Sequence, residues 1–186
     1  VGGVKLMAEV IKVIGKNAFV QVFESTRGMR VGDEAEFEGH MLEVTLGPGM
    51  LSRNYDGLQN DLDKMEGVFL KRGEYTFPLD NDKLWDFKPL AKVGDKVAAG
   101  GWLGEVDENF QPHKIMVPFT FKGEYTVKSL KEAGQYTIGE VIAVLTDETG
   151  KDVEVTMIQR WPVKRAITCY KEKPRPYKLL ETGVRT

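Results

Sequence analysis

The chain has 186 residues, 41% of them hydrophobic and 29% charged, which is enough to bury one large core or two small ones. A formal net charge of −2 and a pI of about 5.8 provide no overall attraction for nucleic acid or an anionic membrane. The single cysteine, Cys169, excludes an internal disulfide and fits a reducing compartment. The sequence shows no signal-peptide pattern and no apolar run of roughly 20 residues, so we expect membrane contact only through partners.

Residues 1–66 are predicted to form a small antiparallel β-barrel and a linker. Between residues 4 and 46, short apolar blocks alternate with glycine-containing turns, the spacing typical of a small barrel. The turns are placed at residues 15–17, 27–28, 32–33 and 38–40. Because the chain opens on Val1 and not on Met, we also expect that it was cut from a longer protein.

The strand pattern stops at residues 47–49, where two glycines flank a proline and favour a tight irregular connection. Leu58, Leu62 and Met65 follow at offsets of four and three, which predicts one short helix over residues 55–65. Four acidic residues lie in or beside it, and we interpret them as a solvated helix face in preference to a paired-carboxylate catalytic site. They are Asp56, Asp61, Asp63 and Glu66.

Residues 67–156 again have a strand-like pattern, and they contain a weak internal repeat. Residues 93–106 and 133–145 each combine a glycine turn, a short strand and a closing apolar strand. This outline predicts a barrel-sandwich hybrid of two interlocking hairpin layers. Biotinyl and lipoyl carrier domains share it, so one alternative function is a swinging-arm carrier with its prosthetic group on Lys114. His113 and Ile115, which flank that lysine, depart from the attachment motifs of both carriers, and an ordinary solvated lysine is the competing interpretation.

Residues 157–186 are predicted to be an extended connector. A turn at residues 148–151 and alternation of Val153, Val155 and Met157 indicate one more strand. Prolines at 162, 174 and 176 then remove backbone donors from any continuous sheet or helix. Basic and aromatic side chains interleave in this segment, but acidic residues interrupt them, so a connector packing on neighbouring domains is preferred to a nucleic-acid strip.

We assign no catalytic, cofactor-binding or metal-binding residue to the chain. Both Gly-Lys pairs, at residues 15–16 and 150–151, lack the Ser or Thr and the earlier glycine of a phosphate-binding P-loop. We interpret both pairs as hairpin turns. His40, His113 and Cys169 are too far apart in sequence for a zinc-ligand spacing. A partly buried structural cysteine is the preferred interpretation of Cys169.

Three motifs in order carry a resemblance to a known family. They are Gly-Pro-Gly-Met-Leu at 47–51 with Tyr-Asp-Gly-Leu-Gln at 55–59, Ile-Met-Val-Pro-Phe at 115–119 with Lys-Gly-Glu-Tyr-Thr-Val at 122–127, and Gln-Arg-Trp-Pro-Val-Lys-Arg at 159–165. With them the chain resembles the N-terminal barrel and bulge region of the catalytic A subunit of V-type and archaeal-type rotary ATPases.

The resemblance implies a parent enzyme that hydrolyses or makes ATP, with Mg²⁺, while translocating protons or sodium ions. It implies that the ATP chemistry belongs to a P-loop domain beyond Thr186, and that the present residues serve assembly. The implied partners are the A and B subunits of a catalytic hexamer, with stator or regulatory subunits meeting the bulge. The implied location is cytoplasmic and peripheral to the membrane, as part of the complex.

Overall fold

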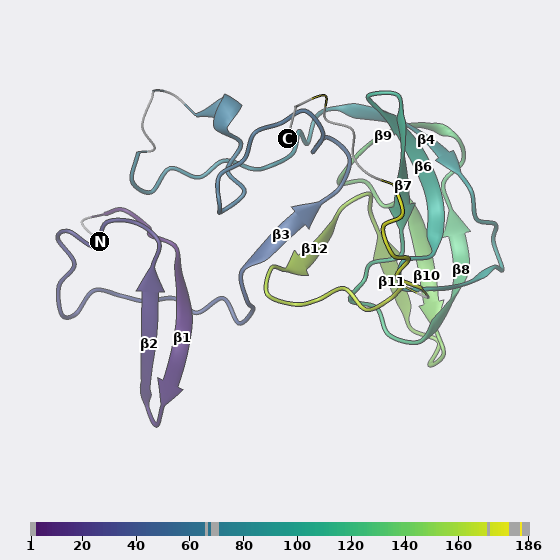
Figure 1. Ribbon diagram of the computed structural model, residues 1–186. Helices are drawn as coiled ribbons and strands as arrows, with labels where there is room; N and C mark the ends of the chain where they lie inside the picture. Colours follow the sequence, from purple (N-terminus) through teal and green to yellow (C-terminus); the bar gives the residue numbers. More distant parts are fainter. Residues whose placement is uncertain (1–2, 66, 68–70, 171, 179–182, 184–186) are drawn as a thin grey trace.

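The computed structural model describes residues 3–65, 67, 71–170, 172–178 and 183. In these residues the regular structure is twelve β-strands and one turn of 3₁₀ helix, so the prediction of a mainly β fold is confirmed. The molecule is elongated (Figure 1), with a hairpin at one end, a larger β domain at the other and a narrow two-stranded sheet between them.

The N-terminal hairpin joins β1 (Ala8–Ile14) to β2 (Asn17–Val22) through the predicted turn at Gly15, whose φ is +58°. The register pairs Val10 with Val20 and Val13 with Ala18, with an irregularity between Val10 and Lys12. One face of the hairpin is therefore wholly apolar, and most of it is exposed. Its members, called the hairpin face below, are Ala8, Val10, Val13, Ala18, Val20 and Val22.

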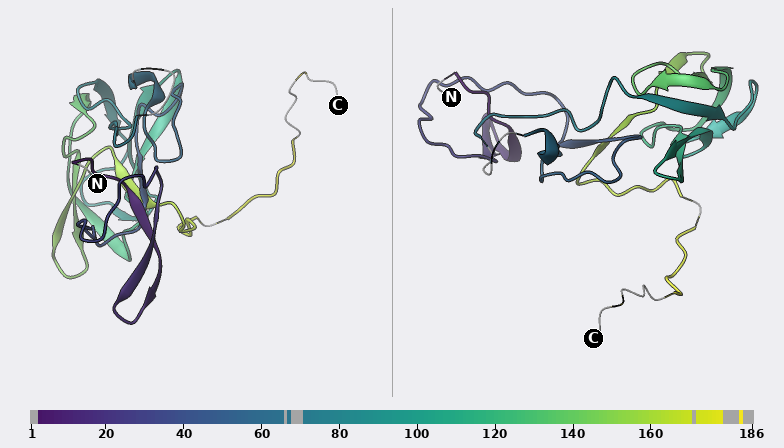
Figure 2. Two further views of the ribbon diagram at one scale, coloured as in Figure 1. Left: turned by 90° about the vertical axis from the view of Figure 1, so that its left-hand side faces the viewer. Right: turned by 90° about the horizontal axis from the view of Figure 1, so that it is seen from above.

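The last apolar stretch of the predicted N-terminal barrel belongs to a different sheet. β3 (Glu43–Leu46) pairs antiparallel with β12 (Gln159–Pro162), which comes from the segment predicted to be a connector. The prediction that this segment joins no sheet is thus wrong for its first residues. Pro162, which lacks an N–H, is the last residue of β12, and residues 172–178 of the tail run away from the body of the molecule (Figure 2).

The predicted helix over residues 55–65 is also wrong, apart from the 3₁₀ turn η1 (Leu62–Lys64). The Asp56 carboxylate accepts hydrogen bonds from the backbone N–H groups of Leu58 (2.9 Å) and Asn60 (2.8 Å). Gln59 has a left-handed φ of +63°. Side-chain bonds of this type compete with helix formation and close a loop instead.

The larger domain is the predicted barrel-sandwich. Its strands are β4 (Leu84–Pro89), β5 (Lys96–Ala98), β6 (Trp102–Glu108), β7 (Gln111–Met116), β8 (Glu124–Leu130), β9 (Gly134–Thr137), β10 (Ala143–Asp147) and β11 (Asp152–Val155). They form two four-stranded antiparallel sheets with orders β7-β6-β4-β9 and β11-β10-β8-β5. The two orders correspond strand for strand, because β4 to β7 and β8 to β11 occupy equivalent places. The second strand of each half pairs in the sheet of the other half: β5 joins β8, and β9 joins β4. The repeated glycine pattern predicts this interlocking.

Two buried clusters hold this domain together. One includes Trp85, Phe87 and Ile138, and Met50 from the segment after β3 packs against it. The other is centred on Leu103, Val117 and Leu145, each fully buried. Because Met50 packs against the first cluster, the segment after β3 is part of the barrel-sandwich core and is more than a linker.

Candidate interdomain junction

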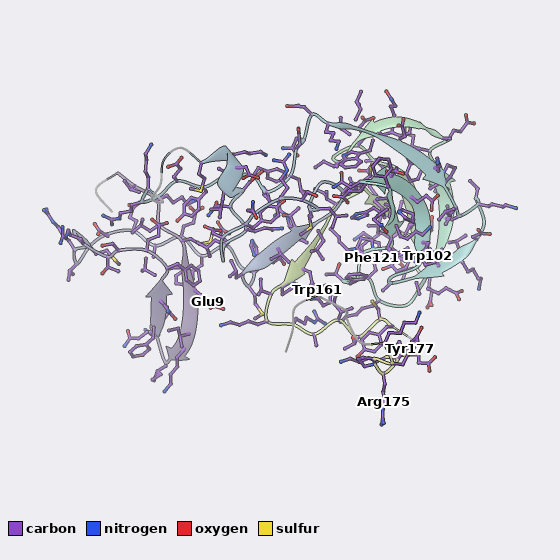
Figure 3. The ribbon with its side chains drawn as sticks, turned by 45° about the horizontal axis from the view of Figure 1, so that its top comes forward. Glu9, Trp102, Phe121, Trp161, Arg175 and Tyr177 are labelled. Carbon is purple, nitrogen blue, oxygen red and sulfur yellow. The ribbon has the colours of Figure 1, made fainter. Side chains whose placement is uncertain are left out.

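The three sequence motifs meet where β3 and β12 join the barrel-sandwich domain. Gln159 faces Leu46 in the β3–β12 register, and its side-chain oxygen accepts a hydrogen bond of 2.9 Å from the backbone N–H of Phe119. The rings of Phe119 and Trp161 pack edge to face, with centroids 5.8 Å apart. Figure 3 places Trp161 beside the central sheet, between Glu9 on the hairpin and Trp102 on the barrel-sandwich. The junction is thus assembled from all three motifs.

Glycine is required at the point where β3 enters the junction. A Cβ on Gly47 would lie 2.7 Å from the Ile158 side chain and 3.2 Å from the Met157 carbonyl oxygen. Gly49 has a φ of +104° and approaches the ring of Trp85. Close backbone approach and a left-handed φ are two features that select glycine, and here both serve the contact with the barrel-sandwich domain.

A buried carboxylate locks this segment to the barrel-sandwich domain. Glu108, at the end of β6, is 2% exposed, and its Oε1 accepts hydrogen bonds from the backbone N–H groups of Gly49 (2.7 Å) and Leu51 (2.9 Å). Its Oε2 lies 2.6 Å from Nδ1 of His113. Glu108 was absent from the candidates that the sequence suggested, because nothing in its local pattern distinguishes it from the exposed Asp107. His113, interpreted as isolated, is its partner.

A second buried carboxylate organises the loop after the junction. Asp61 is fully buried and lies 2.9 Å from Nη1 of Arg53 and 3.7 Å from Nζ of Lys64. Its backbone N–H donates to Thr76. Burial, together with the negative charge of Asp61, raises the pKa of the Tyr55 hydroxyl, which donates to the Pro78 carbonyl.

The acidic residues of this loop therefore differ from the solvated helix face that we predicted. Asp61 is buried and paired, and Asp56 caps the loop described above. Asp63 is exposed, as expected, and Glu66 lies outside the described residues. Gln59 adds a further link, because its side-chain amide exchanges two hydrogen bonds of 2.7 Å with the backbone of Thr45 in β3.

The segment after β12 packs back on the junction and on the hairpin. The indole N–H of Trp161 donates to the Arg165 carbonyl at 2.7 Å, and the Arg165 guanidinium lies 5.6 Å from the Trp161 ring centroid. Lys164 forms an ion pair with Glu9 of β1 at 2.8 Å. These two basic residues of the interleaved segment are engaged in intramolecular contacts.

The position of Lys114 contradicts the carrier-domain alternative. Lys114 lies within β7, opposite Glu105 of β6, with which it forms an ion pair. The tip of this hairpin is formed by Asn109 and Phe110. A swinging arm needs its lysine at an exposed tip, so this arrangement corrects the prediction. The ion pair with Lys114 also lowers the pKa of the Glu105 carboxyl.

The remaining candidates take part in no reactive cluster in the described part of the chain. Cys169 is partly buried, with its Sγ 3.5 Å from the position of a Cβ built on Gly100. The ring of His40 is partly exposed and lies near its neighbours Glu38 and Glu43. Among the residues described, no three His, Cys, Asp or Glu side chains gather as metal ligands, and none of the helical structure is long and apolar enough to span a membrane.

Comparisons with known proteins account for both folded regions. Residues 76–164 match the barrel-sandwich domain of the ATP synthase alpha/beta subunits, and residues 2–39 match the β-barrel domain of the ATP synthase alpha/beta family. The chain is 47% identical to the V-type ATP synthase alpha chain of Treponema denticola over 100% of its length. This chain belongs to the ATP synthase alpha/beta family.

Other V-type ATP synthase alpha chains agree with this assignment. That of Borreliella burgdorferi is 46% identical over 98% of this chain, and that of Protochlamydia amoebophila is 43% identical over 100%. The chain spans 32% of the length of each of these three relatives. The resemblance found in the three motifs is thereby confirmed, and the family model supports the predicted barrel at the N-terminal end.

Proposed function

We propose that this chain is an assembly module of the catalytic A subunit of a V-type, ion-translocating rotary ATPase. The relatives are about three times as long as this chain, and its sequence contains no P-loop. We therefore assign ATP and Mg²⁺ chemistry to a nucleotide-binding domain outside residues 1–186. The proposed domain limits remain 1–66 for barrel and linker, 67–156 for the bulge and 157–186 for the connector.

The exposure of the hairpin face is the main support for this proposal. Val10, Val13 and Val20 are 41%, 65% and 44% exposed, although they form a continuous apolar surface. A two-stranded hairpin is marginally stable alone and needs its apolar face covered. The elongated chain, with its extended tail included, exposes 13970 Å², against about 9,000 Å² expected of a compact monomer of this mass. Surface of this kind fits a module that completes its packing in a larger assembly.

The geometry of the junction supports the same role. Gln159 ties the central sheet to the barrel-sandwich domain, and Gln59 ties the sheet to the loop that follows it. Glu108 ties β6 to the segment after β3. Such a rigid frame suits a crown that holds A and B subunits in a hexamer while other domains open and close. In this proposal the bulge faces outward toward stator or regulatory subunits, and the complex, peripheral to the membrane on the cytoplasmic side, provides the membrane contact.

The test is assembly of the full-length A subunit carrying Val10→Ser, Val13→Ser and Val20→Ser with its B subunit, followed by native mass spectrometry. We expect loss of the hexamer with nucleotide binding by the isolated A subunit retained. Val93→Ser, at a 65% exposed apolar residue of the barrel-sandwich, is the matched control and should assemble normally. A triple variant that forms hexamers as readily as the wild type would overturn the proposal.

A further inference from the structure

Backbone strain is concentrated at one corner of the barrel-sandwich domain. Four non-glycine residues of the described chain have a left-handed φ, and three of them lie at this corner: Ser52 (+61°), Asn109 (+53°) and Phe110 (+64°). Left-handed backbone is uncommon for any non-glycine residue and is a genuine outlier for a bulky one such as phenylalanine. Strain of this type persists where the surrounding structure enforces it, and it clusters at functional sites.

Asn109 and Phe110 form the two-residue turn between β6 and β7, where Glu108 pairs with Gln111. Two central residues with positive φ define a type I′ turn, which favours Asn followed by Gly. The chain has the preferred Asn but places Phe where Gly is favoured. The Phe110 ring does not compensate by packing, because the residue is 94% exposed.

Two side-chain hydrogen bonds brace the corner. The Phe110 N–H donates to Oδ1 of Asp107 at 3.0 Å, and the Asn109 amide donates to Oγ of Ser52 at 3.1 Å. Directly beneath the turn, Glu108 binds the backbone N–H groups of Gly49 and Leu51 as described above. Leu51, 49% exposed, is thereby brought to the same corner as Phe110. The result is a braced turn that displays an exposed aromatic ring, with the exposed Leu51 in the neighbouring segment.

We propose that Phe110 is a docking residue, whose exposed ring inserts into an apolar pocket with a basic rim on a different protein subunit of the complex. Aromatic side chains that fill pockets dominate the energetics of protein interfaces, and preorganisation lowers the entropic cost of binding. Asp107 is exposed in the same turn, where it accepts the Phe110 N–H, and its negative charge favours a cationic rim. The same carboxylate and the net charge of −2 disfavour a phosphate-rich partner. The inference rests on the assembly role proposed above and names a contact within it.

The first test is site-specific crosslinking in the purified intact complex, with the photoreactive amino acid benzoylphenylalanine in place of Phe110. We expect one crosslink to a different subunit, at a peptide that contains apolar residues and Lys or Arg. A crosslink to a second copy of this subunit, or only within the same chain, would overturn the proposal, as would the absence of any crosslink. The hairpin-face assembly assay does not involve Phe110, so failure of either proposal is distinguishable from failure of the other.

The second test separates strain from binding. Phe110→Gly should raise the Tm of the isolated chain by about 2–4 °C, because glycine adopts the left-handed turn without strain. In the complex, the same variant should bind the crosslinked subunit at least about tenfold more weakly. Phe110→Leu should restore part of the affinity, and Val93→Ser should leave it unchanged. A Phe110→Gly variant with wild-type affinity would show that the exposed ring has no docking role.

Discussion

Glu108 and Gly49 join the barrel-sandwich domain to the segment that follows β3 through a hydrogen bond of 2.7 Å between a buried carboxylate and a backbone N–H. The same carboxylate serves Leu51 and His113, so one side chain satisfies three polar groups contributed by two parts of the chain. Because buried donors without acceptors are costly, the junction should be sensitive to the loss of the Glu108 carboxylate.

Replacement Glu108→Ala should lower the free energy of unfolding by about 2–4 kcal/mol, because it leaves two backbone N–H groups without an acceptor. Urea denaturation followed by tryptophan fluorescence measures the change. Glu154→Ala, at an exposed carboxylate on β11, is the matched control and should shift the stability by less than about 0.5 kcal/mol. Equal effects of the two substitutions would mean that the junction does not depend on the buried carboxylate.

Gly47→Ala should destabilise the protein by about 1–3 kcal/mol, since the added methyl group overlaps the Ile158 side chain and crowds the Met157 carbonyl. Thermal unfolding would detect the change as a lower Tm. Gly139→Ala is the matched control, because a Cβ there meets nothing within 4 Å and its φ is not left-handed. That control should be neutral or slightly stabilising. Tolerance at Gly47 equal to that at Gly139 would refute a tightly packed junction.

Sequence patterns predicted the barrel-sandwich well because its repeated glycine turns and alternating valines are local signals. Gly94 and Gly100, with φ of +92° and +78°, occupy such turns. The polar junction was not predictable in the same way, because Asp107 and Glu108 are adjacent carboxylates and only the fold decides which of them is buried. The helix prediction failed because hydrogen bonds of the Asp56 side chain to the backbone close a loop, and the spacing of Leu58, Leu62 and Met65 does not reveal them. Pairing of β3 with β12 depends on contacts across more than 100 residues, which periodicity does not reveal.

Asp61→Asn should cost about 2–4 kcal/mol of stability, because a neutral amide in the same buried position leaves Arg53 and Lys64 without their anionic partner. Both cations are partly exposed, so water offsets some of the loss. Denaturant unfolding of the variant is compared with that of Asp63→Asn, which changes an exposed carboxylate two residues away. Asp61 would have no structural role in the loop if both variants unfolded at the wild-type midpoint.

The turn between β10 and β11 should contribute to the acid sensitivity of the protein. Hydrogen bonds from the Thr149 hydroxyl, and then from the Lys151 backbone, lower the pKa of Asp147. A carboxyl whose pKa is lower in the folded state adds stability that is present above its unfolded pKa, about 3.9, and is lost as the pH falls through the folded value. Asp147→Asn removes this linkage, so its Tm should fall less steeply than that of the wild type below about pH 4.

Differential scanning calorimetry from pH 6 down to about pH 2 measures these slopes. Glu148→Gln, in the same turn but with an exposed side chain, should retain the wild-type acid slope. Thr149→Val should flatten the slope in the same direction as Asp147→Asn, because it removes the largest cause of the lowered pKa. If Asp147→Asn and the wild type lost Tm in parallel through this range, the hydrogen bonds to Asp147 would not be coupled to folding.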